Sequence, residues 1–336
     1  MRRRLLAAAG VALVLSFGTA VTATADPPDS GSAGGPPPLL PDTSGAPRIA
    51  NIIEVSATRT ELFVDSPAMQ RTVRVDVLHP SGDAPRPSFY LLDGVDAGDQ
   101  QSTWTAETDI VSFFANKNVN VVLPVGGAAS YYTDWKRVDP VLGVNAWESF
   151  LTEELPPLID AEFRGTGANA VGGLSMGGHA AMNLITRHPD LYRGVAAYSS
   201  CPDSTNANAR NTVRATVASK GGDANNMWGP NEDPDWVAHD PVTNAGALRG
   251  KTVYMSVGNG LPGPHELRPD AGVLAEVISG AGLEWAAMTC TRDFQARMDA
   301  LRIPGNFVYR PVGTHTWPYW QDDLHHSWPT IAAALG

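Results

Sequence analysis

The sequence predicts an α/β fold in which helices flank a mostly parallel central sheet. Short, nearly continuous apolar runs that end at turn residues, such as those at 88–94 and 119–127, are typical of strands buried on both faces. These runs alternate with segments of helical spacing, an order that favours parallel strands. A serine also stands between one such strand and one such helix, in the stretch AVGGLSMGGHAAMNLITRHP at 170–189.

The N-terminal segments indicate how the chain is organised. Residues 1–25 have a basic start, a short apolar run and a small-residue end, ATA, which predicts a secretory signal peptide too short to span a membrane. The Pro-, Gly- and Ser-rich stretch at 26–49 predicts a flexible stalk. Residues 50–336 then predict a single catalytic domain, without an internal repeat.

Charge and cysteine content limit the partners and the compartment. Without residues 1–25, which hold three arginines and no acids, the chain has 21 basic and 35 acidic residues, a formal charge of −14. This balance argues against nucleic acid as a partner. The two cysteines, Cys201 and Cys290, predict one disulfide in an exported protein. It would close a loop of nearly ninety residues, and the loop-entropy model assigns such a disulfide about 4 to 5 kcal/mol of stabilisation. The alternative is that the two cysteines are buried free thiols.

The remaining elements follow in chain order. The alternating stretch RTVRVDVLHP predicts a strand that ends at Pro80, and the helical spacing of AWESFLTEELPPLIDAEF predicts a helix over 146–163. The next strand, at 168–174, enters the serine turn, and the helix at 177–189 leaves it. Further strands are predicted at 192–200, 251–260 and 305–313. A serine at one strand-to-helix turn of such a series is typical of the α/β-hydrolase fold.

Ser175 is the candidate nucleophile because it lies in the sequence Gly173-Leu174-Ser175-Met176-Gly177. A serine on a strained strand-to-helix turn requires small residues two positions before and after it. The alternative is that Ser175 is only a small residue in a glycine-rich turn. A serine nucleophile needs a base and an orienting acid, which in this fold follow it in the order acid, then histidine.

The base is predicted to be His315, because it follows the last predicted strand, where this fold places its histidine. His179 lies within the helix after the serine. His188 lies at the end of this helix, where a positively charged side chain commonly stabilises the helix C-terminus. His325 and His326 are expected to be solvated on a C-terminal helix.

Spacing alone leaves the acid open among Glu266, Asp270 and Glu284. The oxyanion hole needs two backbone amides, which we expect from Met176, the residue after the nucleophile, and from Val95, which follows Gly94 after an early strand.

Several motifs resemble those of the antigen 85 type mycolyltransferases, a secreted esterase family of bacteria with mycolic-acid envelopes. They are LLDGV with DQQSTW, LPVGGAASYYTDW, WESFLTEELP, VGGLSMGG, NNMWGPNEDPDWVAHDP, VGNG and GTHTWPYW, which occur in the family's order over roughly residues 56–329. The resemblance implies acyl transfer between trehalose mono- or dimycolates or related glycolipids, or onto arabinogalactan, through a mycolyl-serine intermediate. It implies no cofactor and no metal, and we expect a secreted or envelope-associated monomer.

The resemblance also selects the acid. The family's catalytic glutamate stands ten residues before a phenylalanine in a following helix, and Glu284 stands ten before Phe294; Glu266 is the fallback. Glu284 is six residues from Cys290, so a disulfide to Cys201 could brace the segment that holds the acid. The alternative is that the disulfide stabilises the fold without affecting the acid.

The sequence departs from the family at the sugar-binding loop. Family members carry D-G-L-R where this chain has Asp93-Gly94-Val95-Asp96, so a carboxylate replaces an arginine. Asp96 could accept bonds from sugar hydroxyls, or it could be a solvated loop acid. Asp93 matches the family's sugar-contacting aspartate, or it only caps the turn. Among the tryptophans, we place Trp317 beside the acceptor, and expect core packing for Trp135 and Trp228.

The sequence therefore predicts a secreted serine acyltransferase with Ser175, His315 and Glu284 as its catalytic residues. One alternative is a secreted carboxylesterase that uses water as the acceptor. Another is a non-catalytic family member that binds carbohydrate or a matrix protein, although such a protein would have no need of an intact Ser175 and His315.

Overall fold

The computed structural model describes residues 45–267 and 273–336. The predicted signal peptide and most of the predicted stalk lie outside these residues, as does Asp270. Arg48 and Ile49, which the sequence placed in the stalk, are instead the first residues of a strand and pair with Asp65 and Val64.

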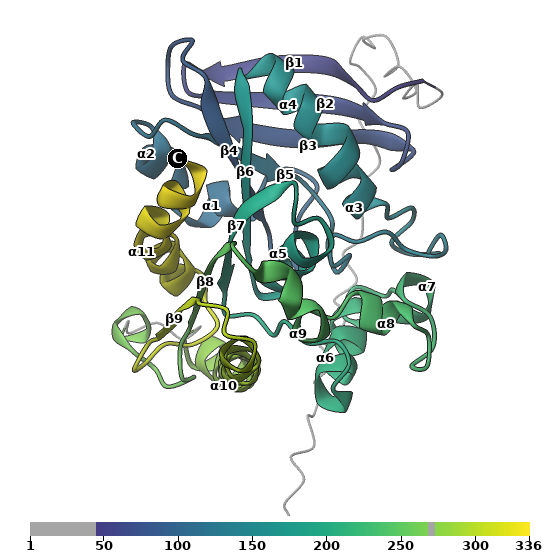
Figure 1. Ribbon diagram of the computed structural model, residues 1–336, viewed down its shortest axis with the longest axis vertical. Helices are drawn as coiled ribbons and strands as arrows, with labels where there is room; N and C mark the ends of the chain where they lie inside the picture. Colours follow the sequence, from purple (N-terminus) through teal and green to yellow (C-terminus); the bar gives the residue numbers. More distant parts are fainter. Residues whose placement is uncertain (1–44, 268–272) are drawn as a thin grey trace, which may run out of the picture. The chain divides into compact units, whose positions relative to one another are not determined.

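Nine strands of the described chain form one sheet in the order β1-β2-β3-β5-β4-β6-β7-β8-β9 (Figure 1). Pairs among β1, β2, β3 and β5 are antiparallel, whereas the five pairs from β5 through β9 are parallel. The predicted α/β-hydrolase fold with a mostly parallel sheet is confirmed. The strands are β1 Arg48–Ser56, β2 Arg59–Ser66, β3 Arg71–Leu78, β4 Arg86–Leu92, β5 Asn120–Pro124, β6 Gly165–Leu174, β7 Tyr192–Tyr198, β8 Thr252–Val257 and β9 Asn306–Tyr309.

Helices cover both faces of the sheet, and each face has its own apolar core. The larger core joins the sheet to α3, α4, α5 and α6, and the smaller core joins it to α1, α2 and α11 (Figure 1). The helices are α1 Thr103–Glu107, α2 Ile110–Phe114, α3 Trp147–Ser149, the π-helical turn η1 Phe150–Glu154, α4 Leu155–Glu162, α5 Ser175–Arg187, α6 Ala207–Ala218, α7 Ala224–Met227, α8 Asp235–Ala238, α9 Pro241–Asn244, the 3₁₀ turns η2 Ala245–Leu248 and η3 Pro264–Glu266, α10 Val273–Ala300 and α11 Trp317–Leu335.

The two covered faces explain why the central strands read as continuous apolar runs. In β4, residues Phe89 to Leu92 are all fully buried, because side chains on both faces of the strand meet a helix layer. By contrast, most residues of the edge strand β1 are exposed, and its pairing with β2 is interrupted by two register shifts. The sequence analysis missed β1, whose exposed residues carry no burial pattern, and it also missed β2, although the burial of β2 alternates along the strand.

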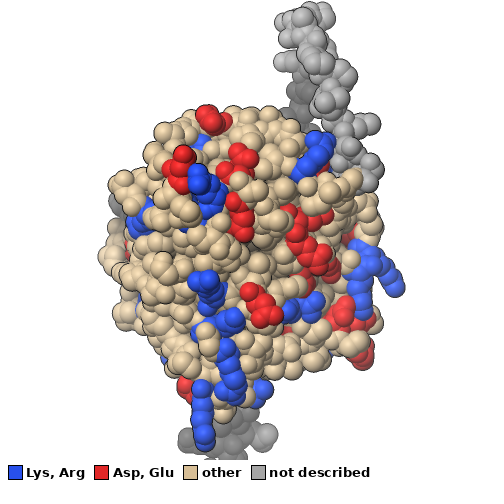
Figure 2. Space-filling model, turned by 45° about the horizontal axis from the view of Figure 1, so that its top comes forward, with Lys and Arg blue, Asp and Glu red and all other residues tan. Residues whose placement is uncertain are grey.

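The surface does not concentrate one sign of charge on the face turned forward in Figure 2, where acidic and basic side chains both occur. Within the described residues, no helix is both long enough and apolar enough to cross a membrane.

Candidate active site

Ser175 occupies a strained turn between β6 and α5. Its φ is +51°, in the left-handed region that a residue with a side chain rarely adopts. A Cβ added to Gly173 would come within 2.5 Å of the backbone of Gly177, and one added to Gly177 would come within 2.3 Å of the carbonyl oxygen of Asp93. The two glycines are therefore required sterically, which is the physical content of the motif.

The three candidate catalytic side chains meet in one hydrogen-bonded line. Nε2 of His315 lies 2.9 Å from Oγ of Ser175, and Nδ1 lies 2.8 Å from Oε2 of Glu284. Glu284 is fully buried. This geometry lets the imidazole accept the serine proton while the carboxylate holds its other nitrogen.

The second oxygen of Glu284 is held by three donors. Oε1 accepts hydrogen bonds from Oγ of Ser199 at 2.8 Å, the amide of Gly258 at 2.5 Å and Nη2 of Arg310 at 2.8 Å. Burial alone would raise the pKa of Glu284, but the hydrogen bond and charge of His315, the charge of Arg310 and the Gly258 bond outweigh it and lower the pKa below its ordinary value. The carboxylate is thus kept ionised and fixed.

Arg310 and Ser199 are residues that the sequence analysis missed. Arg310 immediately follows β9 and also forms an ion pair with the buried Asp323 of α11. Ser199 follows β7 with a φ of +47°. Arg310 left one sequence signal, since it is a cation within the apolar run NFVYRPV.

Glu266, the fallback acid, has a different role. Its carboxylate accepts bonds from Oγ1 of Thr314, from the hydroxyl of Tyr319 at 2.6 Å and from the amide of Gly263 at 2.7 Å. Thr314 immediately precedes His315. Glu266 therefore anchors the loop that carries the imidazole, and within the described residues it makes no bond to the imidazole itself.

The candidate oxyanion amides lie on two segments that touch. Met176 is in the first turn of α5, where backbone amides have no partner within the helix. A Cβ added to Gly94 would lie 3.9 Å from Cβ of Ser175 and 2.8 Å from a methyl carbon of Leu174. The turn that carries Val95 is therefore packed against the nucleophile.

A cavity of about 300 Å³ opens beside the nucleophile. Ser175, Met176 and His315 line one part of it, and α6 and α10 supply its walls. Two large apolar side chains on α10, Leu283 and Trp285, line it while remaining 52% and 60% exposed. The cavity can therefore accept an apolar group next to the reacting oxygen.

Cys201 and Cys290 form the predicted disulfide, with a Cα–Cα distance of 4.9 Å. The bond joins the segment after β7 to α10, and both cysteines line the cavity. The adjacent Thr291 also donates to the carbonyl oxygen of Ser200 at 3.4 Å. The helix that carries Glu284 is therefore tied to the sheet within two turns of the acid.

Replacing both cysteines by serine is expected to lower the free energy of unfolding by about 4 kcal/mol, because the unfolded chain regains the entropy of a long loop. Urea unfolding at neutral pH measures the difference. Wild type in reductant is expected to match the double variant, whose own stability should not respond to reductant. A double variant with unchanged kcat would show that the bond does not brace Glu284.

The structure does not bring the three candidate sugar-binding residues into this cavity. Asp93 is fully buried and caps α1, accepting bonds from the amides of Thr103 at 2.9 Å and Trp104 at 3.2 Å. Burial raises the pKa of Asp93 to about 7, although these bonds oppose the rise. Its position fits the turn-capping alternative.

Asp96 and Trp317 do not line the cavity either. The Asp96 side chain is 76% exposed and pairs with Lys220 at 2.5 Å. Trp317 is half-buried and packs edge-on against Trp104 and Trp320, at centroid distances of 5.3 and 5.2 Å. Trp135 and Trp228 are buried in the larger core.

Two histidines differ from the sequence prediction. His325 is not simply solvated: its ring stacks on Phe113 at 4.0 Å and pairs with Asp109 at 2.8 Å. His188 ends α5 as expected, but its Nε2 lies 2.6 Å from a carboxylate oxygen of Glu148.

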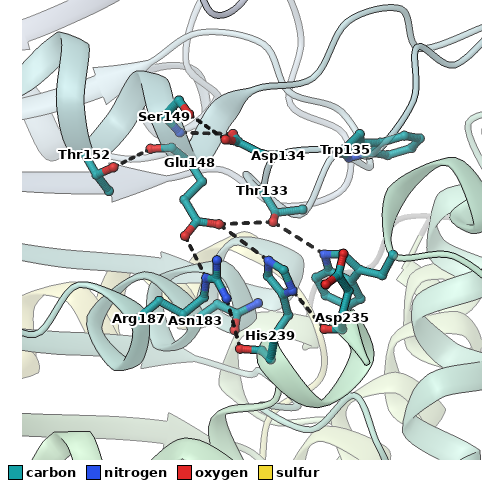
Figure 3. Close-up of polar contacts among 12 residues, drawn as sticks. Thr133, Asp134, Trp135, Glu148, Ser149, Thr152, Asn183, Arg187, Asp235 and His239 are labelled. Carbon is teal, nitrogen blue, oxygen red and sulfur yellow. Dashed lines mark hydrogen bonds and ion pairs between the residues drawn. The ribbon is translucent and has the colours of Figure 1, made fainter. Parts of the chain in front are cut away.

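Glu148 is the centre of a network of polar side chains that includes Thr133, Arg187 and His239 (Figure 3). Its Oε1 accepts from Nε of Arg187 at 2.7 Å, and its Oε2 lies 3.5 Å from Nε2 of His239. The His239 ring stacks on Trp228, which in turn packs against the cavity residue Tyr131. The network therefore holds α3, α5 and the segment after α8 together under the cavity wall.

The network predicts a specific loss of stability in acid. Burial would raise the pKa of Glu148, but bonds from His188 and His239 and the charge of Arg187 lower it well below its ordinary range. A depressed carboxyl pKa adds stability that is present above the unfolded value, about 4.3, and is lost as the pH falls below it. We therefore expect this group to cost wild type about 2 kcal/mol between pH 5 and pH 3.

The measurement is urea unfolding of wild type and Glu148→Gln at pH 7, 5 and 3. The variant should be less stable at pH 7, because Arg187 loses its buried anionic partner. It should then lose less stability than wild type between pH 5 and pH 3. Parallel pH curves for the two proteins would contradict the assignment.

Three comparisons place the chain among known proteins. The family model named Esterase matches residues 66–331. The diacylglycerol acyltransferase/mycolyltransferase Ag85A of Mycobacterium leprae is 34% identical over 289 residues, covering 82% of this chain and 83% of the relative. Ag85B of the same organism is 31% identical over 320 residues, covering 91% and 93%.

Two solved structures also align with most of this chain. Mycobacterium tuberculosis MPT51 (FbpC1) aligns with a TM-score of 0.70 at 28% identity, covering 84% of this chain and 100% of that one. An S-formylglutathione hydrolase from Agrobacterium tumefaciens aligns with a TM-score of 0.61 at 17% identity, a likeness of fold alone.

Proposed function

The chain belongs to the esterase family that includes the antigen 85 mycolyltransferases, and we propose that it is a serine acyltransferase working through an acyl-serine intermediate. The observation that carries the proposal is the continuous line from Ser175 through His315 to Glu284, beside a cavity that admits an apolar group. The relatives named as acyltransferases support the reaction class.

In the first half-reaction, Oγ of Ser175 attacks the ester carbonyl of the donor while Nε2 of His315 takes the hydroxyl proton. The Val95 and Met176 amides donate to the oxygen that becomes negatively charged, and one such donor typically contributes about 3 kcal/mol. Glu284 holds Nδ1 and stabilises the imidazolium. The donor alcohol then leaves with the proton from Nε2, and the acyl group remains on Ser175.

In the second half-reaction the steps reverse with a new alcohol. His315 removes the acceptor's hydroxyl proton, and the acceptor oxygen attacks the acyl-serine. Transfer requires this alcohol to compete with water, which a positioned acceptor can do because orientation removes much of the entropic barrier.

For the substrates, we propose a mycolyl or similar long-chain ester of trehalose as donor, and trehalose mycolate or cell-wall arabinogalactan as acceptor. The likeness to mycolyltransferases supports this choice. The buried position of Asp93 and the exposed carboxylate of Asp96 mean that any sugar is held differently from the D-G-L-R pattern.

We further propose that residues 1–25 export the chain, that the segment from residue 26 to the start of β1 tethers a monomeric catalytic domain, and that the enzyme acts at the cell envelope. The basic and apolar composition of the first segment supports export. The reaction as proposed needs no cofactor or metal ion. Within the described residues, no group of three His, Cys, Asp or Glu side chains is placed to hold one.

The deciding experiment is product analysis after incubation with a trehalose monoester and no other acceptor. We expect trehalose diester and free trehalose in equal amounts, because one monoester is donor and the other acceptor. Mass spectrometry or thin-layer chromatography measures both products, with Ser175→Ala as the matched inactive control. Free acid without diester would make the protein a carboxylesterase, and no turnover at all would favour a binding protein.

A further inference from the structure

Four large apolar side chains are exposed on the segments that flank the catalytic centre. They are Leu261, Leu267, Leu283 and Trp285, which are 59%, 82%, 52% and 60% exposed. Of the nine tryptophans in the chain, Trp285 is the exposed one, whereas the others are buried or half-buried. Exposed apolar side chains that gather in one place mark an interaction site. We call these four residues the mouth patch.

The patch is assembled by two segments that pack against each other. Leu261 lies in the loop after β8, whereas Leu283 and Trp285 lie on α10. A Cβ added to Gly260 would come within 2.4 Å of the carbonyl oxygen of Ala281, so the loop touches the helix two residues before Leu283. Leu261 and Leu283 therefore belong to neighbouring stretches of one surface.

The first of these segments also holds the loop that carries His315. The carbonyl oxygen of Leu261 accepts a hydrogen bond from the amide of Gly313 at 2.7 Å. Leu267 directly follows Glu266, whose carboxylate anchors the same loop. The mouth patch therefore lies beside the catalytic centre rather than at a distance from it.

The two segments carry no exposed formal charge of their own. Residues 259–267 and 279–291 contain no lysine, arginine or aspartate, and their two glutamates, Glu266 and Glu284, are buried. The one histidine, His265, pairs with Asp322 at 2.8 Å. A surface that binds anionic lipids is rich in basic residues. These segments have none, and the chain as a whole has a formal charge of −11, so the patch fits an uncharged partner.

The patch is continuous with the cavity at Ser175. Leu283 and Trp285 line the cavity and are also more than half exposed, so the apolar surface extends from the inside of the cavity to the outside of the molecule. The wall on α6 is polar instead, with Asn208 and Thr212 exposed along it. One side of the opening thus suits acyl chains and the other suits head groups, which is the order found at the surface of a lipid layer.

We propose that the mouth patch docks the protein on an uncharged lipid surface, with the cavity open to the acyl layer. Leucine and tryptophan side chains favour the boundary between head groups and acyl chains. An acyl chain could then enter the cavity without crossing water, which avoids the cost of hydrating its apolar surface. Docking itself follows from the patch alone. Only the view that this surface supplies the acyl donor rests on the proposed function.

The test is flotation of the full chain with lipid vesicles in a density gradient. The protein carries Ser175→Ala, so that no turnover changes the lipid. We expect it to float with phosphatidylcholine vesicles and to bind no better when phosphatidylglycerol is added. Phosphatidylcholine brominated in its acyl chains should quench tryptophan fluorescence, because Trp285 would lie within reach of the bromine atoms.

Matched variants in the same background locate the contact. Leu261→Gln and Trp285→Gln should each weaken vesicle binding at least tenfold, because each replaces an apolar side chain that enters the lipid. Trp285→Phe should retain most of the binding and lose most of the quenching. Ile53→Gln is the control, since Ile53 is 44% exposed on β1, at the opposite edge of the sheet. It should bind as well as the parent.

Four outcomes would overturn the proposal. The protein could fail to float with phosphatidylcholine, or bind only when anionic lipid is present. Unchanged binding in both Leu261→Gln and Trp285→Gln would place the contact elsewhere in the chain, including the apolar run within residues 1–25. A dimer in sedimentation that Leu261→Gln dissociates would assign the patch to a second copy of this chain.

The results separate docking from the proposed reaction. Wild type that transfers acyl groups but does not float would contradict docking and leave the proposed function in place. Wild type that floats through the mouth patch but transfers nothing would support docking and contradict the proposed function.

Discussion

Replacing Ser175 by alanine is expected to reduce kcat for a short-chain chromogenic ester by about 10⁴- to 10⁶-fold. The change removes only the nucleophilic oxygen that lies 2.9 Å from Nε2 of His315. Rate assays with purified protein, together with mass spectrometry of the acyl-enzyme, measure the loss. The variant should neither turn over nor gain the mass of the acyl group.

Ser219→Ala is the matched control. Ser219 caps the end of α6, is exposed and does not line the cavity, so the same chemical change there should leave kcat within twofold of wild type. Ser175→Ala should retain the wild-type unfolding midpoint, because the substitution removes no contact except the hydrogen bond to His315. Retention of wild-type kcat by Ser175→Ala would contradict the assignment of Ser175 as the nucleophile.

Replacing Arg310 by glutamine is expected to lower the free energy of unfolding by about 3 to 5 kcal/mol and to reduce kcat at least tenfold. The side chains of Glu284 and Asp323 are 0% and 2% exposed, so both carboxylates lose a buried cation. Glu284 then keeps only two of the three donors to Oε1, and its orientation toward His315 is less fixed.

A pH profile separates this positioning role from a general loss of stability. Arg310 helps to lower the pKa of Glu284, so without it the carboxylate protonates at a higher pH. The acid limb of kcat should therefore move to higher pH in Arg310→Gln. It should return toward wild type in Arg310→Lys, which restores the charge but not the planar fork.

Asp323→Asn is the control for the pair. Burial raises the pKa of Asp323 to about 6, against the opposing charge of Arg310, and its loss should destabilise the fold. Because Arg310 still reaches Glu284 in this variant, the acid limb should not move to higher pH. An identical shift in both variants would mean that the acid limb of kcat reflects unfolding of the protein. It would contradict the role of Arg310 in positioning Glu284.

The parts of the site that the sequence predicted are those set by chain order. Ser175 and His315 each follow a strand, and strand ends at one edge of a parallel sheet are brought together by the fold itself. Glu284 required the family resemblance, because it lies within the long helix α10 and not directly after a strand. Spacing could not distinguish it from Glu266, which lies on the same side of His315 in the chain.

The parts that the sequence did not predict depend on side-chain packing. The bonds from Ser199 and Arg310 to Glu284 connect residues 85 and 26 positions apart, and no local pattern encodes such pairs. For Asp93, the residue type and its place in a motif suggested contact with a ligand. In the structure Asp93 is buried, and its oxygens accept hydrogen bonds from the first amides of α1 instead. The strand β1 was missed because its exposed residues carry no burial pattern.

Helix α10 is both a wall of the cavity at Ser175 and the support of Glu284, the proposed catalytic acid. Glu284 projects from it to His315, while Leu283 and Trp285, its immediate neighbours, line the cavity. A rigid shift of the helix that admitted a bulkier acyl group would carry the carboxylate away from the imidazole. Tolerance for longer or branched chains must therefore evolve by exchanging individual side chains on a stationary helix, and engineered variants of altered chain-length preference should be sought among those positions rather than in changes to the helix ends.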